Sequence, residues 1–196
     1  WKHASVCEDY SAVQCPVFAV SGWADGYTNT VFRLMERLDV PRKGLIGPWG
    51  HKYPHMGGPG PVIDFLHECV RWWDQWLKNK ETGVKDDPMI RAWMKDTVSP
   101  ISPQRPGRWV GEKTWPAPDI RNRRFNLLYG ELSCEPDQKS QAVLSIQSPL
   151  SVGLFAGKWC SYSETTDLPS DQREEDGGSL VFDTRPLKED MEILGA

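Results

Sequence analysis

The chain has 196 residues, of which 39% are hydrophobic and 26% are charged, a composition typical of a folded protein rather than a disordered one. Its formal net charge of −4 argues against a nucleic-acid partner, since nucleic acid selects a basic face. No apolar run approaches the roughly 18 residues needed to cross a membrane, so we expect no membrane partner.

The first part of the chain alternates predicted strands and helices. Residues 16–20 form a short apolar run, typical of a buried strand, and residues 44–47 form a second. Apolar side chains recur at helical spacing over residues 31–38 and again over 62–78. Short buried strands separated by helices predict a parallel sheet covered on both faces. Three tryptophans of the second helix are expected to pack rather than bind a ligand: Trp72, Trp73 and Trp76.

After residue 87 the pattern changes to strands separated by turns rich in Pro, Gly, Ser and Asp. The predicted strands cover residues 89–94, 124–129, 142–146 and 179–184. The acidic run 171–176 is interpreted as a solvated loop. We therefore predict an α/β fold in two parts. Residues 1–87 would be the C-terminal part of a parallel α/β sheet domain, and residues 88–196 an incomplete all-β sandwich.

Two loops carry side chains suited to catalysis, and each follows a predicted strand. The first covers residues 21–27 and contains Asp25, and the second covers residues 46–51 and contains His51. In open α/β sheets, sites form beyond the carboxyl ends of the strands. Because adjacent parallel strands end at the same edge, we expect the carboxylate and the imidazole to lie close together.

A carboxylate beside an imidazole is the arrangement that general-base catalysis needs. The carboxylate holds the imidazole in one tautomer and stabilises it once it is protonated. In α/β-hydrolases the chain order is Ser, then Asp or Glu, then His, and Asp25 before His51 matches the second half of that order. No G-x-S-x-G elbow is present, and neither Ser21 nor Ser179 fits one. We therefore expect the nucleophile to lie upstream of this chain.

Less specific interpretations stay open beside this one. An Asp-Gly pair after a strand is often only a turn, and a histidine in a Gly/Pro loop is often structural. The chain could then be a non-catalytic binding module whose aromatic-rich sandwich docks a ligand. It could also be a structural relative of a hydrolase that keeps Asp25 and His51 but lacks the nucleophile.

Histidine and cysteine spacing predicts no metal site, and nothing in the sequence indicates a cofactor. His51 and His55 are four positions apart, but Pro54 between them disfavours a shared helix face. No C-x-x-C pair occurs, and we expect free, mostly buried thiols. The cysteines are Cys7, Cys15, Cys69, Cys134 and Cys160.

Several motifs resemble one known family. They are Gly22-Trp23-Ala24-Asp25-Gly26-Tyr27, Gly47-Pro48-Trp49-Gly50-His51, the helix through Arg71-Trp72-Trp73-Asp74-Gln75-Trp76, and Arg108-Trp109 with Trp115-Pro116. Looser matches follow at residues 179–182 and 187–195. This set resembles the cocaine-esterase-like and X-prolyl dipeptidyl aminopeptidase-like serine hydrolases, and the resemblance covers nearly the whole chain.

The resemblance implies an α/β-hydrolase domain followed by a jelly-roll domain, with this chain a C-terminal fragment. The family's acid falls on Asp25 and its histidine on His51, while Tyr27 matches an acyl-pocket aromatic. Leu154 and Phe155 match a jelly-roll pair that reaches that pocket.

The activity implied is hydrolysis of an ester, an amide or a short peptide through an acyl-enzyme, without a cofactor. Since the serine, the oxyanion donors and the cap of the family are absent from this sequence, the chain alone is expected to be inactive. The resemblance leaves a homo-oligomer open, and it leaves the compartment open between cytoplasm and secretion.

Overall fold

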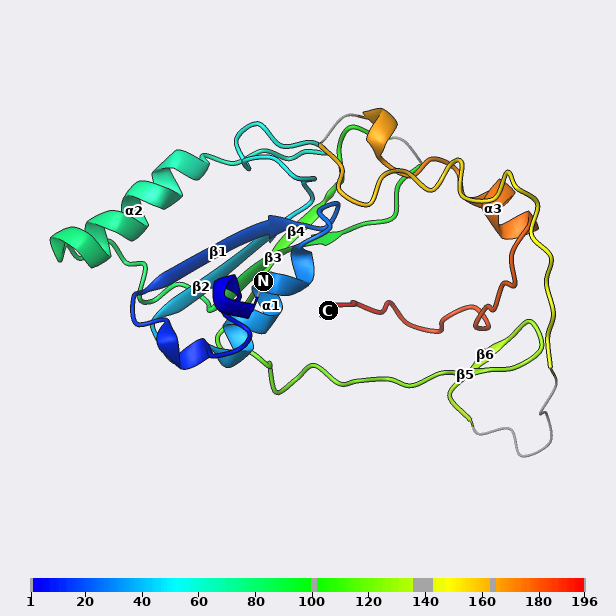
Figure 1. Ribbon diagram of the computed structural model, residues 1–196, viewed down its shortest axis with the longest axis horizontal. Coiled ribbons are helices and arrows are strands. Elements are labelled where there is room, and N and C mark those ends of the chain that lie inside the picture. The colour runs from blue at the N-terminus through cyan, green and yellow to red at the C-terminus, as the bar shows by residue number, and fades with distance from the viewer. Residues whose placement is uncertain (1, 100–101, 136–142, 163–164, 196) are drawn as a thin grey trace.

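A four-stranded mixed sheet forms the centre of the computed structural model (Figure 1). The structure describes residues 2–99, 102–135, 143–162 and 165–195. The strands, in the order in which they lie in the sheet, are β1 (Val17–Gly22), β2 (Arg42–Gly47), β3 (Ile90–Lys95) and β4 (Gly107–Glu112). The first three run parallel and β4 runs antiparallel to β3. The predicted parallel sheet is therefore confirmed, with an antiparallel strand added at one edge.

Helix α1 (Thr28–Arg37) covers one face of the sheet and buries the main core. Its side chains Val31, Phe32 and Met35 are buried in a cluster with four strand residues. Those strand residues are Ala19, Ile46, Ile90 and Ala92. The predicted helical stripe at 31–38 is thus the core-facing side of α1.

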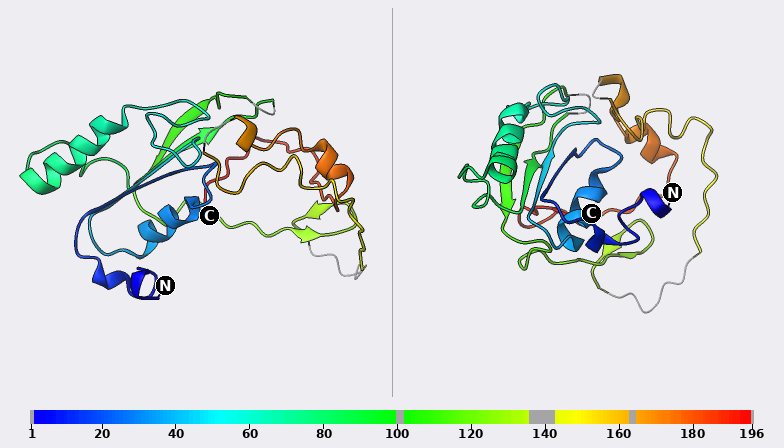
Figure 2. Two further views of the ribbon diagram at one scale, coloured as in Figure 1. Left: turned by 45° about the horizontal axis from the view of Figure 1, so that its top comes forward. Right: turned by 60° about the vertical axis from the view of Figure 1, so that its left-hand side comes forward.

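Helix α2 (Phe65–Lys78) lies on the opposite face, as the two views of Figure 2 show. Phe18 points to this face because it alternates with Ala19 along β1, and its ring stacks on Trp72 with centroids 5.5 Å apart. The helix begins at Phe65 rather than at the predicted residue 62, because the Asp64 side chain caps it by accepting a hydrogen bond from the His67 backbone N–H at 3.2 Å.

One packing prediction for α2 is wrong. Trp72 is buried, but Trp73 is 55% exposed. Trp73 belongs to an exposed apolar stripe with Leu66, Val70 and Leu77. The predicted helical period thus spans two sides of α2. Phe65, near the Phe18 ring, and Trp76, near the Trp72 ring, are partly buried on the sheet side, whereas the side that carries Trp73 is exposed.

The described residues of 113–195 form an extended arm that leaves the sheet and returns to it (Figure 1). The arm carries a short hairpin of β5 (Asn126–Leu127) and β6 (Leu132–Ser133), then the 3-10 helix η3 (Thr165–Asp167) and α3 (Arg173–Gly177). The N-terminal segment holds two further 3-10 helices, η1 (Lys2–Ala4) and η2 (Tyr10–Ala12). In the last described part of the arm, Leu194 packs against the main core cluster.

Several predicted elements of this arm differ from the structure. Residue 142 lies outside the described residues, and 143–146 form no strand. Residues 179–184 form no strand either, because only Asp183 pairs with another described residue, Glu131, through an isolated bridge. The strand predicted at 89–94 is β3, which joins the parallel strands instead of opening a separate sheet. The predicted jelly roll is not confirmed.

The acidic run 171–176 is also not the solvated loop that we predicted. Its residues 173–176 lie in α3, where Glu175 is buried. The Glu175 carboxylate accepts hydrogen bonds from the backbone N–H of Phe155, at 2.8 Å, and of Gly153. This carboxylate therefore ties α3 to the neighbouring segment of the arm.

Among the described residues, none of the helices has the length and apolar character required to cross a membrane.

Gly22 allows the loops after β1 and β2 to approach closely. A Cβ atom at Gly22 would overlap the backbone carbonyl of Trp49. We expect Gly22→Ala to destabilise the protein by about 1–3 kcal/mol, the usual cost of overpacking, measured by urea unfolding. Gly177→Ala is the matched control, since its Cβ would meet nothing within 4 Å. Equal effects of the two substitutions would contradict the prediction.

Candidate active site

Asp25 and His51 meet at the carboxyl edge of the sheet. The loops that carry them are joined by backbone hydrogen bonds, from Trp23 N–H to the Gly47 carbonyl at 2.9 Å and from Ala24 N–H to the Trp49 carbonyl at 3.0 Å. This pairing places Asp25 Oδ2 3.1 Å from His51 Nδ1. The two residues that the sequence singles out are therefore in direct contact.

The carboxylate of this pair is shielded and the imidazole is accessible. The Asp25 side chain is 10% exposed, whereas that of His51 is 43% exposed. Asp25 Oδ1 accepts a hydrogen bond from the Tyr27 backbone N–H at 2.9 Å, which fixes the carboxylate. A carboxylate beside Nδ1 favours the tautomer with hydrogen on Nδ1, which leaves Nε2 with the lone pair that a general base needs.

Aromatic side chains surround the imidazole. The Tyr27 ring lies 5.6 Å from that of His51 and 5.2 Å from that of Trp159, measured between centroids. The ring centroid of Tyr162 lies 5.5 Å from that of His51, in an edge-to-face contact. The His51 backbone N–H donates to the Ser161 carbonyl at 2.5 Å. The arm thus returns to the sheet at residues 159–162 and completes one side of the site.

Sequence reasoning missed residues 159–162 as part of the site. The only signal was a tryptophan and a tyrosine close together in an otherwise polar segment. They line the site because the segment crosses the carboxyl ends of the strands, which the local pattern does not encode.

A cavity of about 420 Å³ opens beside Asp25. Its walls come from the loop after β1, the first turn of α1 and the returning arm. Trp23, Asp25, Asn29, Lys158, Trp159 and Leu168 are among the lining residues. Two aromatic rings and a leucine beside a carboxylate suit a small, partly apolar ligand.

Leu154 and Phe155 do not line this cavity. Both are exposed, and the Phe155 backbone carbonyl accepts a hydrogen bond from the Ser170 N–H at 3.0 Å. The structure brings Tyr27 to the acid–histidine pair and leaves the Leu154–Phe155 pair on the outer part of the arm. A role for that pair in the acyl pocket stays a prediction.

Asp167 anchors the returning segment of the arm. Its carboxylate lies 2.6 Å from Lys158 Nζ and accepts a hydrogen bond from the Tyr162 backbone N–H at 3.2 Å. The hydrogen bond from Lys158, followed by that from Tyr162, lowers the pKa of Asp167 below its ordinary value. A lowered folded-state pKa stabilises the fold above the ordinary Asp pKa, and this contribution is lost as pH falls through the lowered value.

We expect Lys158→Met to raise the pKa of Asp167 toward its ordinary value, because it removes the largest cause of the shift. The measurement is an NMR pH titration of the Asp167 carboxyl carbon. Lys78→Met is the control, since Lys78 contacts Asp74 on α2. An Asp167 titration that Lys158→Met leaves unchanged would contradict the assignment.

The five cysteines are free, as predicted, but they are not mostly buried. Cys7, Cys15 and Cys134 are exposed, and Cys69 and Cys160 are partly exposed. Cys160 lies beside the acid–histidine pair, with ligand atoms of Asp25, His51 and Cys160 all within 4.8 Å of one another. The sequence could not indicate this group, because Cys160 is distant from the other two along the chain.

Comparison with known proteins identifies the family of this chain. Residues 82–196 match the X-Pro dipeptidyl-peptidase C-terminal non-catalytic domain, and residues 1–53 match the X-Pro dipeptidyl-peptidase (S15 family). The chain belongs to the X-Pro dipeptidyl-peptidase family. This membership confirms the resemblance seen in the sequence motifs.

Individual relatives agree with this membership. A Mycobacterium bovis protein named "Putative serine esterase" is 23% identical over 197 residues, covering 95% of this chain and 30% of its own length. A Bacillus anthracis protein named "Putative Xaa-Pro dipeptidyl-peptidase" is 22% identical over 205 residues, covering 100% of this chain and 30% of its own. The chain thus spans about 30% of the length of these relatives.

Among solved structures, a CocE/NonD family hydrolase from Staphylococcus aureus superimposes with a TM-score of 0.48 at 14% identity. The superposition covers 65% of this chain and 22% of that structure's chain.

Proposed function

We propose that this chain supplies the acid and the histidine of a Ser-His-Asp triad that hydrolyses ester or amide bonds. The observation that carries the proposal is the 3.1 Å contact between Asp25 Oδ2 and His51 Nδ1 at the carboxyl ends of two adjacent parallel strands. Membership of a serine-hydrolase family supports it. The nucleophilic serine and the oxyanion donors would come from a part of the protein outside these 196 residues.

In the proposed mechanism, His51 Nε2 takes the proton of the serine hydroxyl as its oxygen attacks the substrate carbonyl. Asp25 holds the Nδ1–H and stabilises the imidazolium that forms. The imidazolium then protonates the leaving alcohol or amine, which leaves an acyl-enzyme. His51 next removes a proton from water, and the resulting attack releases the acid and restores the serine.

The substrate would be a small ester, an amide or a short peptide, with no cofactor. Tyr27, Trp159 and Tyr162 would form an aromatic wall on the arm side of the acyl pocket, as their contacts around His51 support. We assign residues 1–87 to the catalytic α/β domain and 88–196 to a β domain. In this assignment, β3 and β4 of the second part extend the sheet of the first.

A fluorophosphonate probe tests the proposal, because it reacts only with a serine activated by a base. The test uses the whole protein that contains this chain. We expect one serine to be labelled in the parent protein and labelling to be lost in His51→Ala. Mass spectrometry of the labelled peptide would locate the serine. Labelling that survives His51→Ala at the parent rate would overturn the proposal.

The second candidate is a non-catalytic binding or structural module of the same fold. The match of residues 82–196 to a domain described as non-catalytic favours it for that part of the chain. A folded whole protein that the probe never labels would support this alternative.

A further inference from the structure

We propose that Asp25, His51 and Cys160 form a Zn²⁺ site whose occupation switches off the acid–histidine pair. The three side chains come from the loop after β1, the loop after β2 and the returning arm. One ligand atom from each lies within 4.8 Å of the other two. Carboxylate, imidazole and thiolate are the three side-chain groups that Zn²⁺ accepts in proteins.

The spacing suits a tetrahedral ion after a small adjustment. Zinc bonds of about 2.0–2.3 Å place tetrahedral ligand atoms roughly 3.3–3.8 Å apart. His51 Nδ1 and Asp25 Oδ2 are 3.1 Å apart. One nitrogen of His51, one carboxylate oxygen of Asp25 and the Cys160 sulfur all lie within 4.8 Å of one another. A shift of about 1 Å therefore closes the site.

Charge also favours a divalent cation. A thiolate and a carboxylate with a neutral imidazole carry two negative charges, which one Zn²⁺ balances. Lys158 is the cationic side chain that lines the neighbouring cavity. The Asp167 carboxylate, 2.6 Å from Lys158 Nζ, compensates the charge of this lysine. The thiolate favours Zn²⁺ over Mg²⁺ or Ca²⁺, which prefer all-oxygen ligands. Water from the cavity beside Asp25 can take the fourth position.

Binding changes the proton balance of the pair. The Cys160 thiol releases one proton to solvent as it becomes a thiolate ligand. If the ion binds Nδ1 of His51, the imidazole proton moves to Nε2; if it binds Nε2, the ion occupies the lone pair itself. In both cases Nε2 can no longer accept a proton. The loss of base function rests on the proposed function, whereas metal binding itself does not.

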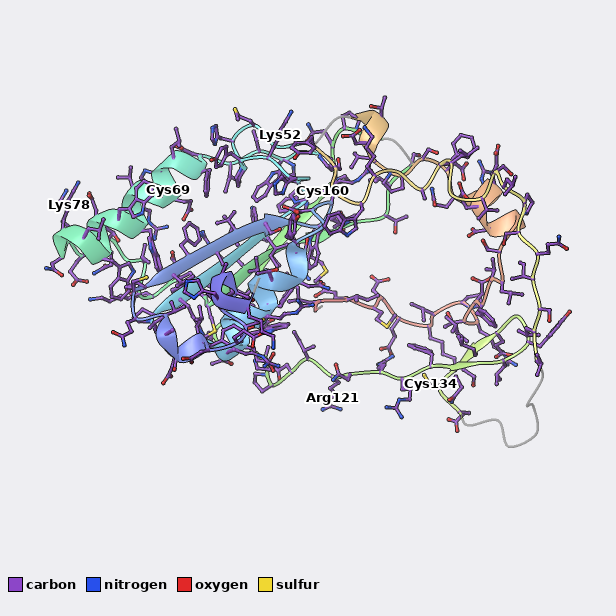
Figure 3. All side chains as sticks on the ribbon, in the orientation of Figure 1. Lys52, Cys69, Lys78, Arg121, Cys134 and Cys160 are labelled. Atoms are coloured by element: carbon purple, nitrogen blue, oxygen red, sulfur yellow. The ribbon has the colours of Figure 1, made fainter. Side chains whose placement is uncertain are left out.

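Co²⁺ is the probe for the site, because a thiolate bound to Co²⁺ gives a strong near-ultraviolet charge-transfer band. We expect the parent protein to show this band at one ion per chain and Zn²⁺ to abolish it. Cys160→Ser should lose the band, and His51→Ala should weaken Co²⁺ affinity by about 100-fold. Cys134→Ser is the matched control, because Cys134 is an exposed thiol on the lower part of the arm, well away from Cys160 (Figure 3). A band that survives Cys160→Ser, or no band in the parent, would overturn the site.

The same samples separate this inference from the proposed function. The readout is the ratio of fluorophosphonate labelling rates with and without Zn²⁺. We expect Zn²⁺ to slow labelling at least about 10-fold in the parent protein, and that effect to disappear in Cys160→Ser. A cobalt band without any labelling would keep the metal site and reject the hydrolase. Labelling that Zn²⁺ leaves unchanged, without a band, would keep the hydrolase and reject the metal site.

Discussion

Asp25→Asn is expected to lower kcat of the whole protein by about 10⁴-fold, equivalent to about 5 kcal/mol of transition-state stabilisation. The asparagine amide can donate to His51 Nδ1, which would place the imidazole proton on Nε2 and remove the base. The substitution also removes the negative charge that stabilises the His51 imidazolium. The Tyr27 backbone N–H, 2.9 Å from Asp25 Oδ1, can still bind the amide oxygen, so the loop should keep its shape.

The measurement is steady-state hydrolysis of an activated ester, with the unfolding free energy measured in parallel. Asp171→Asn is the control, since the Asp171 carboxylate contacts Arg173 on the exposed side of α3. The control should keep the parent kcat. An Asp25→Asn protein that is folded and retains kcat within 10-fold would show that Asp25 does not assist His51.

Trp49→Ala is expected to cost about 3–5 kcal/mol of unfolding free energy. Trp49 is 1% exposed, and its indole N–H donates to the Pro61 carbonyl at 2.8 Å. The ring also fills the space that Gly47 and Gly57 leave open, because a Cβ at either would collide with it. Its removal would create a cavity within the loop that carries His51.

Trp73→Ala is the matched control, because it removes the same side chain from a 55% exposed position on α2. Denaturant unfolding of both variants should show a difference of at least about 2 kcal/mol. Equal losses of unfolding free energy in Trp49→Ala and Trp73→Ala would contradict the prediction that buried Trp49 stabilises the fold more than exposed Trp73.

The sequence was sufficient to predict the sheet core and the central pair of the site. Apolar runs and helical periods identify β1, α1, β2 and α2, because burial on a sheet or a helix face imposes those periods. Asp25 and His51 follow directly after the two strands, and parallel strands end at a shared edge. Their contact therefore follows from local pattern and topology alone.

The rest depends on long-range packing that no local pattern encodes. The sequence of β3 indicates a strand but does not say that β2 would be its partner. The acidic composition of 171–176 predicts exposure and does not distinguish Glu175 from its neighbours. The burial of Glu175 depends on two backbone N–H groups about 20 positions away. Residues 159–162 reach His51 only because the arm folds back across the sheet.

The return of the arm also bears on how the molecule folds. The contact between His51 and Ser161 closes a loop on the order of 100 residues, whereas β1 pairs with β2 across one helix. We therefore expect the sheet, and with it the Asp25–His51 pair, to form early, and the aromatic side of the pocket to assemble last. In the native state that side should open more often than the sheet. Hydrogen exchange at the His51 amide should therefore be faster than at the Gly44 amide, which donates to the Met89 carbonyl at 2.7 Å from the inner strand β2. The protein would thus hold its acid and base in rigid strand ends and place beside them a wall that can move.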